Sequence, residues 1–80
     1  MNSSLIENVV DNVIEYYKDA ASFDKLRKVE RALNHILPSY TIQTAVYAPS
    51  SRYSPNGLRE PYINHIIVRG KGLWITRDFE

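Results

Sequence analysis

The amino-acid sequence predicts a two-layer α+β sandwich, in which an N-terminal helical hairpin packs on a three-stranded antiparallel sheet. Apolar residues recur at helical spacing in the first half of the chain and at alternate positions from Tyr40 onward. Pro38 marks the change, because the residue before a proline is pushed out of the helical region. The 80 residues suffice for one hydrophobic core, so we expect a single domain over residues 1–80 in the order helix, helix, strand, strand, strand.

The first helix is expected over residues 4–20. Ser4 and Glu7 form a capping-box pair, in which each side chain bonds the other residue's backbone amide at a helix start. One side of this helix is apolar and carries Ile6, Val10, Val13 and Tyr17. The opposite side is acidic and carries Glu7, Asp11, Glu15 and Asp19. Such a row can imitate the phosphates of a nucleic acid toward another protein's basic site, or it can pair with Arg27 or Arg31 of the next helix.

The second helix is expected over residues 23–37, with Ser22 or Asp24 as its N-cap. Its apolar positions cluster on one side and are Leu26, Val29, Leu33, Ile36 and Leu37. The other side is basic and carries Arg27, Lys28, Arg31 and His35. The charge of the chain is therefore divided: residues 1–24 hold five acids and one base, whereas residues 25–80 hold nine bases and four acids.

Three strands are expected, over residues 40–47, 62–69 and 73–79. Their side chains alternate, and they are rich in β-branched and aromatic residues. Residues 48–61 contain three prolines and read as a long loop between the first two strands. The last two strands are joined by Gly70, Lys71 and Gly72, which is typical of a hairpin.

The last hairpin places apolar residues on both faces of the sheet. If it turns on Gly70 and Lys71, one face carries Ile66, Val68, Leu73 and Ile75. The other face then carries Ile63, His65, Ile67 and Trp74. A register shifted by one residue groups Ile67 with Leu73 and Ile75 instead. Two helices cover only one face, so we expect an exposed aliphatic and aromatic patch on the other, unless the loop folds back over it.

An exposed patch of this kind indicates a binding surface. We therefore expect a small non-enzymatic binding protein, such as a regulator or inhibitor of phage or mobile-element type. It would act through contact with another protein or by homodimerisation. The expected contact residues are Tyr47, Arg52, Tyr53, Arg59, Ile67 and Trp74.

Nucleic-acid binding is the alternative function. Seven basic residues could contact phosphates: Arg27, Lys28, Arg31, Arg52, Arg59, Arg69 and Lys71. Tyr47, Tyr53 and Trp74 could stack on bases. The acidic first helix argues against a dedicated binder, which usually has a more uniformly basic surface.

Catalysis has little support in the sequence. The chain has two histidines, no cysteine and no recognised nucleophile or phosphate-loop motif. The order of elements resembles that of small RNase toxins, a second alternative that would use His65, Arg69, Arg77 and Tyr47. His35 and His65 fall on separate elements, so we expect neither a metal nor a cofactor. No apolar run is long enough for a membrane span, so we expect a cytoplasmic protein.

Overall fold

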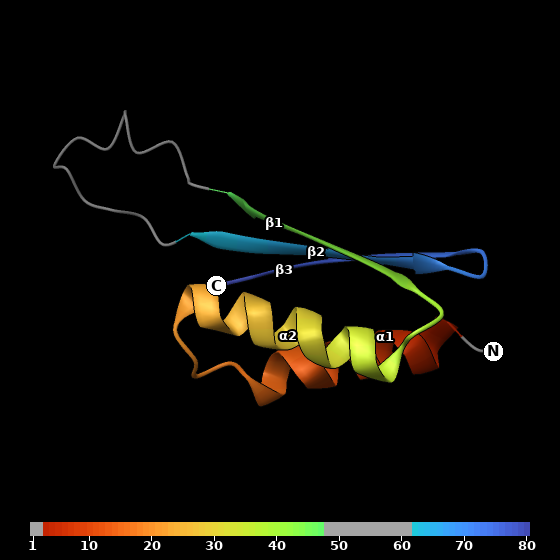
Figure 1. Cartoon of the computed structure of the whole chain (residues 1–80), viewed down its shortest axis with the longest axis horizontal. Coiled ribbons are helices and arrows are strands. Elements are labelled where there is room, and N and C mark those ends of the chain that lie inside the picture. The colour runs from red at the N-terminus through yellow and green to blue at the C-terminus, as the bar shows by residue number, and fades with distance from the viewer. Residues whose placement is uncertain (1–2, 48–61) are drawn as a thin grey trace, which may run out of the picture.

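The chain folds into two layers, with two helices on one face of an antiparallel sheet (Figure 1). A computed structural model describes residues 3–47 and 62–80. The elements are α1 (Ser3–Tyr16), α2 (Ser22–Ile36), β1 (Thr41–Tyr47), β2 (Ile63–Gly70) and β3 (Leu73–Phe79). The predicted α+β class and the order of its elements are confirmed.

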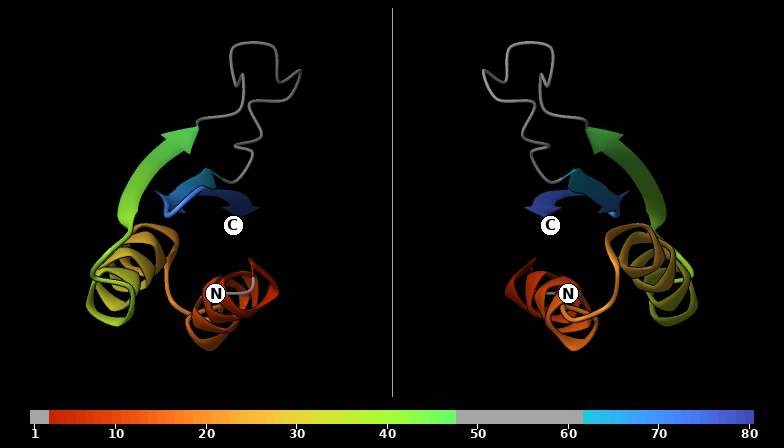
Figure 2. Two further views of the ribbon diagram at one scale, coloured as in Figure 1. Left: turned by 90° about the vertical axis from the view of Figure 1, so that its right-hand side faces the viewer. Right: turned by 90° about the vertical axis from the view of Figure 1, so that its left-hand side faces the viewer.

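The sheet is a simple meander in the order β1-β2-β3, so β2 is its central strand. Both pairings are antiparallel, with Gln43 of β1 opposite Ile67 of β2 and Thr76 of β3 on its other side. Seen from its ends, the molecule has both helices beneath the same face of the sheet (Figure 2). The opposite face is covered by no described element.

The core lies between the helices and the sheet. Ile66 and Val68 of β2 are fully buried, because they point toward the helices from the central strand. They pack with Ile6, Val10, Val29, Leu33, Leu37, Tyr40 and Ile75. Ile36 was expected on this apolar side but is half exposed, whereas Leu37, just beyond the end of α2, is buried. The chain therefore leaves the helix with Leu37, not Ile36, against the core.

The connection between the helices differs from the prediction. α1 ends at Tyr16 and not near Ala20, because the chain then tightens: the Lys18 amide bonds the Glu15 carbonyl and the Ala20 amide bonds the Tyr17 carbonyl. Neither Ser22 nor Asp24 occupies the N-cap position of α2. That position is Ala21. Asp24 lies in the first helical turn, where its negative charge interacts favourably with the positive end of the helix dipole.

The β2–β3 hairpin turns on Lys71 and Gly72, one residue later than expected. Both have positive φ, 53° and 81°, as a two-residue type I′ turn requires. The turn shifts the register by two residues, so Val68 lies opposite Ile75. A shift of two residues leaves every side chain on the same face of the sheet. The face assignment predicted for a turn on Gly70 and Lys71 is therefore confirmed. The residues that point away from the helices are Ile63, His65, Ile67 and Trp74.

Candidate functional site

The open face of the sheet is the first candidate site. It carries alternate residues of the three strands: Thr41, Gln43, Ala45 and Tyr47; Ile63, His65, Ile67 and Arg69; and Trp74, Thr76 and Asp78. We call these residues the open face. The burial of β2 alternates in step, since its helix-facing residues are buried and its open-face residues are half-buried.

The apolar residues of the open face are arranged around Ile67. This side chain lies at the centre of the face, on the central strand. Trp74 lies toward the hairpin end and is 63 % exposed, while Tyr47 lies at the other end of the face and is 54 % exposed. Polar Gln43 and Thr76 flank Ile67, so the aliphatic and aromatic residues expected on this face are interrupted by polar ones.

Two cross-strand pairs that contain a charged or titratable side chain complete the open face, one on each side of Ile67. The guanidinium of Arg69 lies 5.2 Å from the ring centre of Trp74, directly across the strand pair, in a cation–π contact. On the other side, Nδ1 of His65 is 2.5 Å from Oδ1 of Asp78, its cross-strand partner. The His65 ring also meets Tyr47 edge-on, with ring centres 5.5 Å apart. The face thus has a cation toward the hairpin end and a carboxylate toward the opposite end.

The four residues of the RNase alternative do not come together. His65, Arg69 and Tyr47 belong to the open face, but Arg77 points from β3 to the helix side. There its Nε donates to Oδ1 of Asp11 at 2.7 Å, and a terminal nitrogen lies 3.7 Å from Glu7. The hydrogen bond to Asp11 raises the pKa of the Arg77 guanidinium, which keeps it charged and engaged.

The same contacts show what the acidic side of α1 does. Glu7 and Asp11 pair with Arg77 of β3, and not with Arg27 or Arg31 across the helical hairpin as expected. Glu15 accepts a hydrogen bond from Lys18 at 2.8 Å, which raises the pKa of that lysine. Three of the four acids in the row thus have a basic partner within the chain, which leaves the phosphate-imitating row without support.

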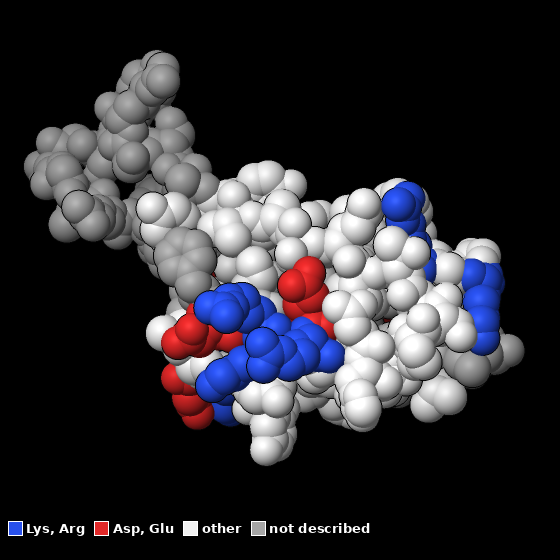
Figure 3. All heavy atoms as spheres, viewed as in Figure 1, with Lys and Arg blue, Asp and Glu red and all other residues white. Residues whose placement is uncertain are grey.

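The outer side of α2 is the second candidate site. Arg27, Lys28 and Arg31 are all exposed there, as expected for the side opposite the apolar stripe. Lysine and arginine side chains gather in front of α2 (Figure 3). Arg27, Lys28 and Arg31 line a hollow of about 140 Å³ together with Asp24. A larger hollow of about 480 Å³ is lined by Tyr17, Lys28, Arg31, Ala32 and His35.

The basic residues proposed for nucleic-acid binding are divided between two sides of the molecule. Arg69 belongs to the open face, and Lys71 at the hairpin lies 5.7 Å from the ring centre of Tyr40. The cations of α2 are exposed on the helix layer, and none of them belongs to the open face. Arg52, Tyr53 and Arg59 lie outside the described residues.

The sequence did not single out Tyr17 or Asp11 as site residues. Tyr17 was read as the last member of the apolar side of α1 and does pack against the core, but it also lines the larger hollow beside α2. Asp11 was one of four equivalent acids, and only the tertiary structure selects it as the partner of Arg77.

Comparison with known proteins gives no relative. No protein-family model, curated protein or solved structure matches this chain. Within residues 3–47 and 62–80, no three histidine or acidic side chains gather into a group that could hold a metal ion. Neither described helix is long and apolar enough to cross a membrane. The candidate sites therefore rest on their own geometry.

Proposed function

We propose that this protein is a small binding protein that associates through the open face of its sheet, and that a second copy of the chain occupies that face. The supporting observation is the exposure of Trp74 and Tyr47 on a face that no described element covers. Aromatic and arginine side chains are the residues that most often anchor interfaces, and Ile67 adds an aliphatic centre. A partner that covered this face would remove all three from water.

The arrangement of charges favours a second copy as the occupant. Along β2, Arg69 and His65 lie two positions to either side of Ile67, and Asp78 is the cross-strand partner of His65. Consider a two-fold axis that lies in the interface, runs across the strands and passes over Ile67. It sets Ile67 against Ile67 of the second copy, and Arg69 against His65 of the second copy, beside which the Asp78 carboxylate of that copy lies. Each copy contributes one cation and one carboxylate, so both contacts are attractive.

The size of the face sets the expected affinity. Strands are about 4.8 Å apart and rise about 3.3 Å per residue, so three strands of seven or eight residues present a small face. Such a face buries less area than the roughly 1,200 Å² typical of stable complexes. We therefore expect a transient dimer with a micromolar dissociation constant.

Sedimentation equilibrium tests the proposal across a concentration series from low to high micromolar. The apparent mass should rise above the monomer value of 9.3 kDa as concentration increases. Ile67→Lys should hold the mass at the monomer value, because it places a charge at the centre of the interface. Ile36→Lys is the matched control, since Ile36 is an exposed isoleucine on α2, and it should associate like the wild type.

Two outcomes would contradict the proposal. One is a wild-type protein that stays monomeric at high micromolar concentration. The other is an Ile67→Lys variant that is folded by circular dichroism and still associates like the control. Association of the wild type only in the presence of a different protein would reassign the face to that partner and overturn the homodimer.

A further inference from the structure

The cations of the chain differ in whether they have a partner. Within residues 3–47 and 62–80, most of them contact a carboxylate, a carbonyl or an aromatic ring: Lys18, Lys25, Arg69, Lys71 and Arg77. Arg27, Lys28 and Arg31 form a second group, with no carboxylate of the described residues within ion-pair distance. All three are exposed and stand on one helix. Their charge is therefore available to a ligand.

The acids nearest in sequence do not neutralise this group. Glu30 faces β1, where its Oε2 accepts a hydrogen bond from Oγ1 of Thr44 at 3.2 Å. Asp24 lines the smaller hollow beside Arg27, Lys28 and Arg31, without an ion pair to them. One nearby carboxylate against three cations leaves the outer side of α2 basic, and it sets a limit on how strongly an anion is held.

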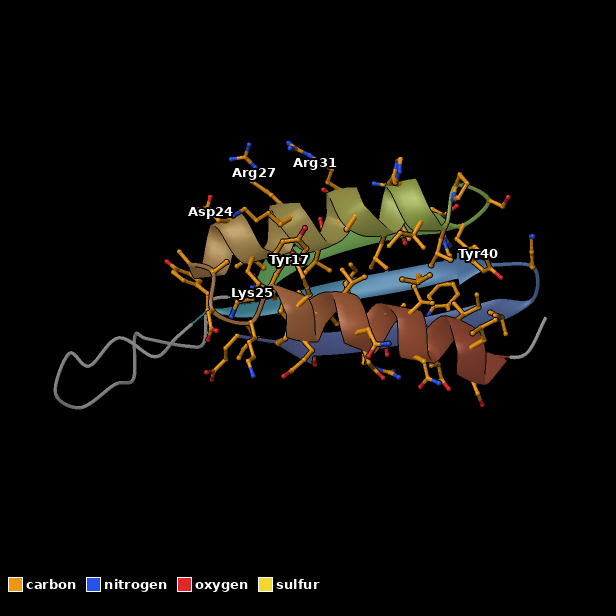
Figure 4. The ribbon with its side chains drawn as sticks, turned by 90° about the horizontal axis from the view of Figure 1, so that it is seen from below. Tyr17, Asp24, Lys25, Arg27, Arg31 and Tyr40 are labelled. Atoms are coloured by element: carbon orange, nitrogen blue, oxygen red, sulfur yellow. The ribbon has the colours of Figure 1, made fainter. Side chains whose placement is uncertain are left out.

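The spacing of the basic residues suits a repeating anion. Arg27, Arg31 and His35 are four residues apart, so each is displaced from the last by about 6 Å along the helix axis. This distance is close to that between neighbouring phosphates of an extended nucleic acid strand. Arg27 and Arg31 both project from the same side of α2, away from α1 (Figure 4). A strand that ran along α2 would meet them in succession.

Aromatic rings stand beside the cations. Tyr17 lies between the two helices and lines the larger hollow with Lys28, Arg31 and His35 (Figure 4). Its ring meets the ring of Tyr16 edge-on, with centres 4.8 Å apart, and Tyr16 is 80 % exposed. An exposed aromatic ring beside phosphate-binding cations is the pairing that single-strand binders use, since every base can stack on it.

We propose that the outer side of α2, together with Tyr16 and Tyr17, binds single-stranded nucleic acid through its phosphates. Lys28 and Arg31 hold phosphate at the larger hollow, Arg27 holds a neighbouring phosphate, and Tyr16 offers a ring to a base. An acidic peptide could use the cations but not the exposed ring in the same way. This surface stands on the helix layer and shares no residue with the open face, so the inference does not depend on the proposed dimer.

The test is fluorescence anisotropy with a labelled single-stranded oligothymidine at low ionic strength. Lys28→Gln/Arg31→Gln should weaken binding at least tenfold. It should also reduce the slope of log affinity against log salt concentration by about 1.4, because each lost phosphate contact contributes about 0.7 for a single strand. Lys71→Gln/Arg77→Gln is the matched control, because it loses the same charge at two cations that belong neither to α2 nor to the open face, and it should change affinity less than twofold.

A second variant separates stacking from charge. Tyr16→Ala removes an exposed ring and leaves every charge in place. It should weaken binding about fivefold, near the low end of what one stacked base contributes, and leave the salt slope unchanged. An unchanged affinity would overturn the role given to Tyr16.

Three results would overturn the inference as a whole. The first is the absence of binding at low salt by a folded wild-type protein. The second is an equal loss of affinity in the Lys71→Gln/Arg77→Gln control. The third is equal competition, per phosphate, by inorganic polyphosphate, which has no bases to stack. A different set of results would assign the surface to a membrane instead. The wild type would bind vesicles that contain an anionic phospholipid but would not bind the oligonucleotide, and Lys28→Gln/Arg31→Gln would lose the vesicle binding. Binding by the monomeric Ile67→Lys variant would show that the two surfaces act separately.

Discussion

Gly70 and Tyr40 approach each other so closely that a side chain at position 70 has no room. A Cβ on Gly70 would lie 3.1 Å from Cδ2 of Tyr40 and 3.3 Å from the Ser39 carbonyl oxygen. Gly70 also has a φ of 151°, which other residues rarely adopt. The buried ring of Tyr40 thus packs against the hairpin and fixes the point at which β1 enters the sheet.

Gly70→Ala should therefore destabilise the protein by about 1–3 kcal/mol, through backbone strain and through displacement of Tyr40. Urea unfolding measures the change. Gly72→Ala is the control, because Gly72 has a φ of 81° but a Cβ there would meet no atom within 4 Å. The Gly72→Ala variant has the backbone strain without the steric clash, so it should lower the free energy of unfolding by less than Gly70→Ala does. Equal losses in the two variants would show that the contact with Tyr40 contributes nothing.

The ion pair between Arg77 and Asp11 joins β3 to α1. The side chain of Arg77 is 32 % exposed and that of Asp11 is 51 % exposed, so we expect a coupling energy of at most about 1 kcal/mol. A double-mutant cycle with Arg77→Gln and Asp11→Asn measures it. Glu7→Gln in place of Asp11→Asn should give a smaller coupling, because Glu7 lies 3.7 Å from the guanidinium. A larger coupling to Glu7 would contradict the observed geometry.

Ile66 and Ile67 are neighbours in sequence on opposite faces of β2. Ile66 is fully buried in the core, whereas Ile67 is half-buried on the open face. Ile66→Ala should cost about 2–5 kcal/mol, comparable with the whole stability of so small a core, and so leave much of the protein unfolded. Ile67→Ala should cost clearly less at low protein concentration. Thermal unfolding compares the two variants, and the reverse order would mean that the strand register is wrong.

The fold could be predicted because each element carries a local signal. Pro38 ends a helix, Gly72 allows a tight turn, and the alternation of Ile66 and Val68 with their neighbours defines two faces. The end of α1 could not be predicted, because apolar Tyr17 continues the helical pattern although the chain has already begun to turn. The position of this turn depends on how the two helices pack against each other, and the local sequence pattern does not show that packing.

The candidate sites were predictable only in part. One of the two registers that the sequence left open placed Ile67 and Trp74 on the same face, and the structure confirms that assignment, with Tyr47 of β1 on the same face. The partner of Arg77 was not predicted, since Asp11 is separated from it by most of the chain and resembles three other acids on the same side of α1. Tyr17 was likewise missed beside Lys28, because a helical stripe does not reveal which of its members reaches a neighbouring helix.

The central claim is that the open face binds a second copy with Arg69 against the His65–Asp78 pair of that copy, and charge reversal at Arg69 and Asp78 tests it most directly. Sedimentation equilibrium at high micromolar concentration should show a weakened dimer for Arg69→Asp and for Asp78→Arg, because each creates a like-charge contact. The double variant Arg69→Asp/Asp78→Arg should recover much of the wild-type association, because it restores opposite charges. A double variant that stays monomeric while folded, or single variants that associate as well as the wild type, would contradict the account.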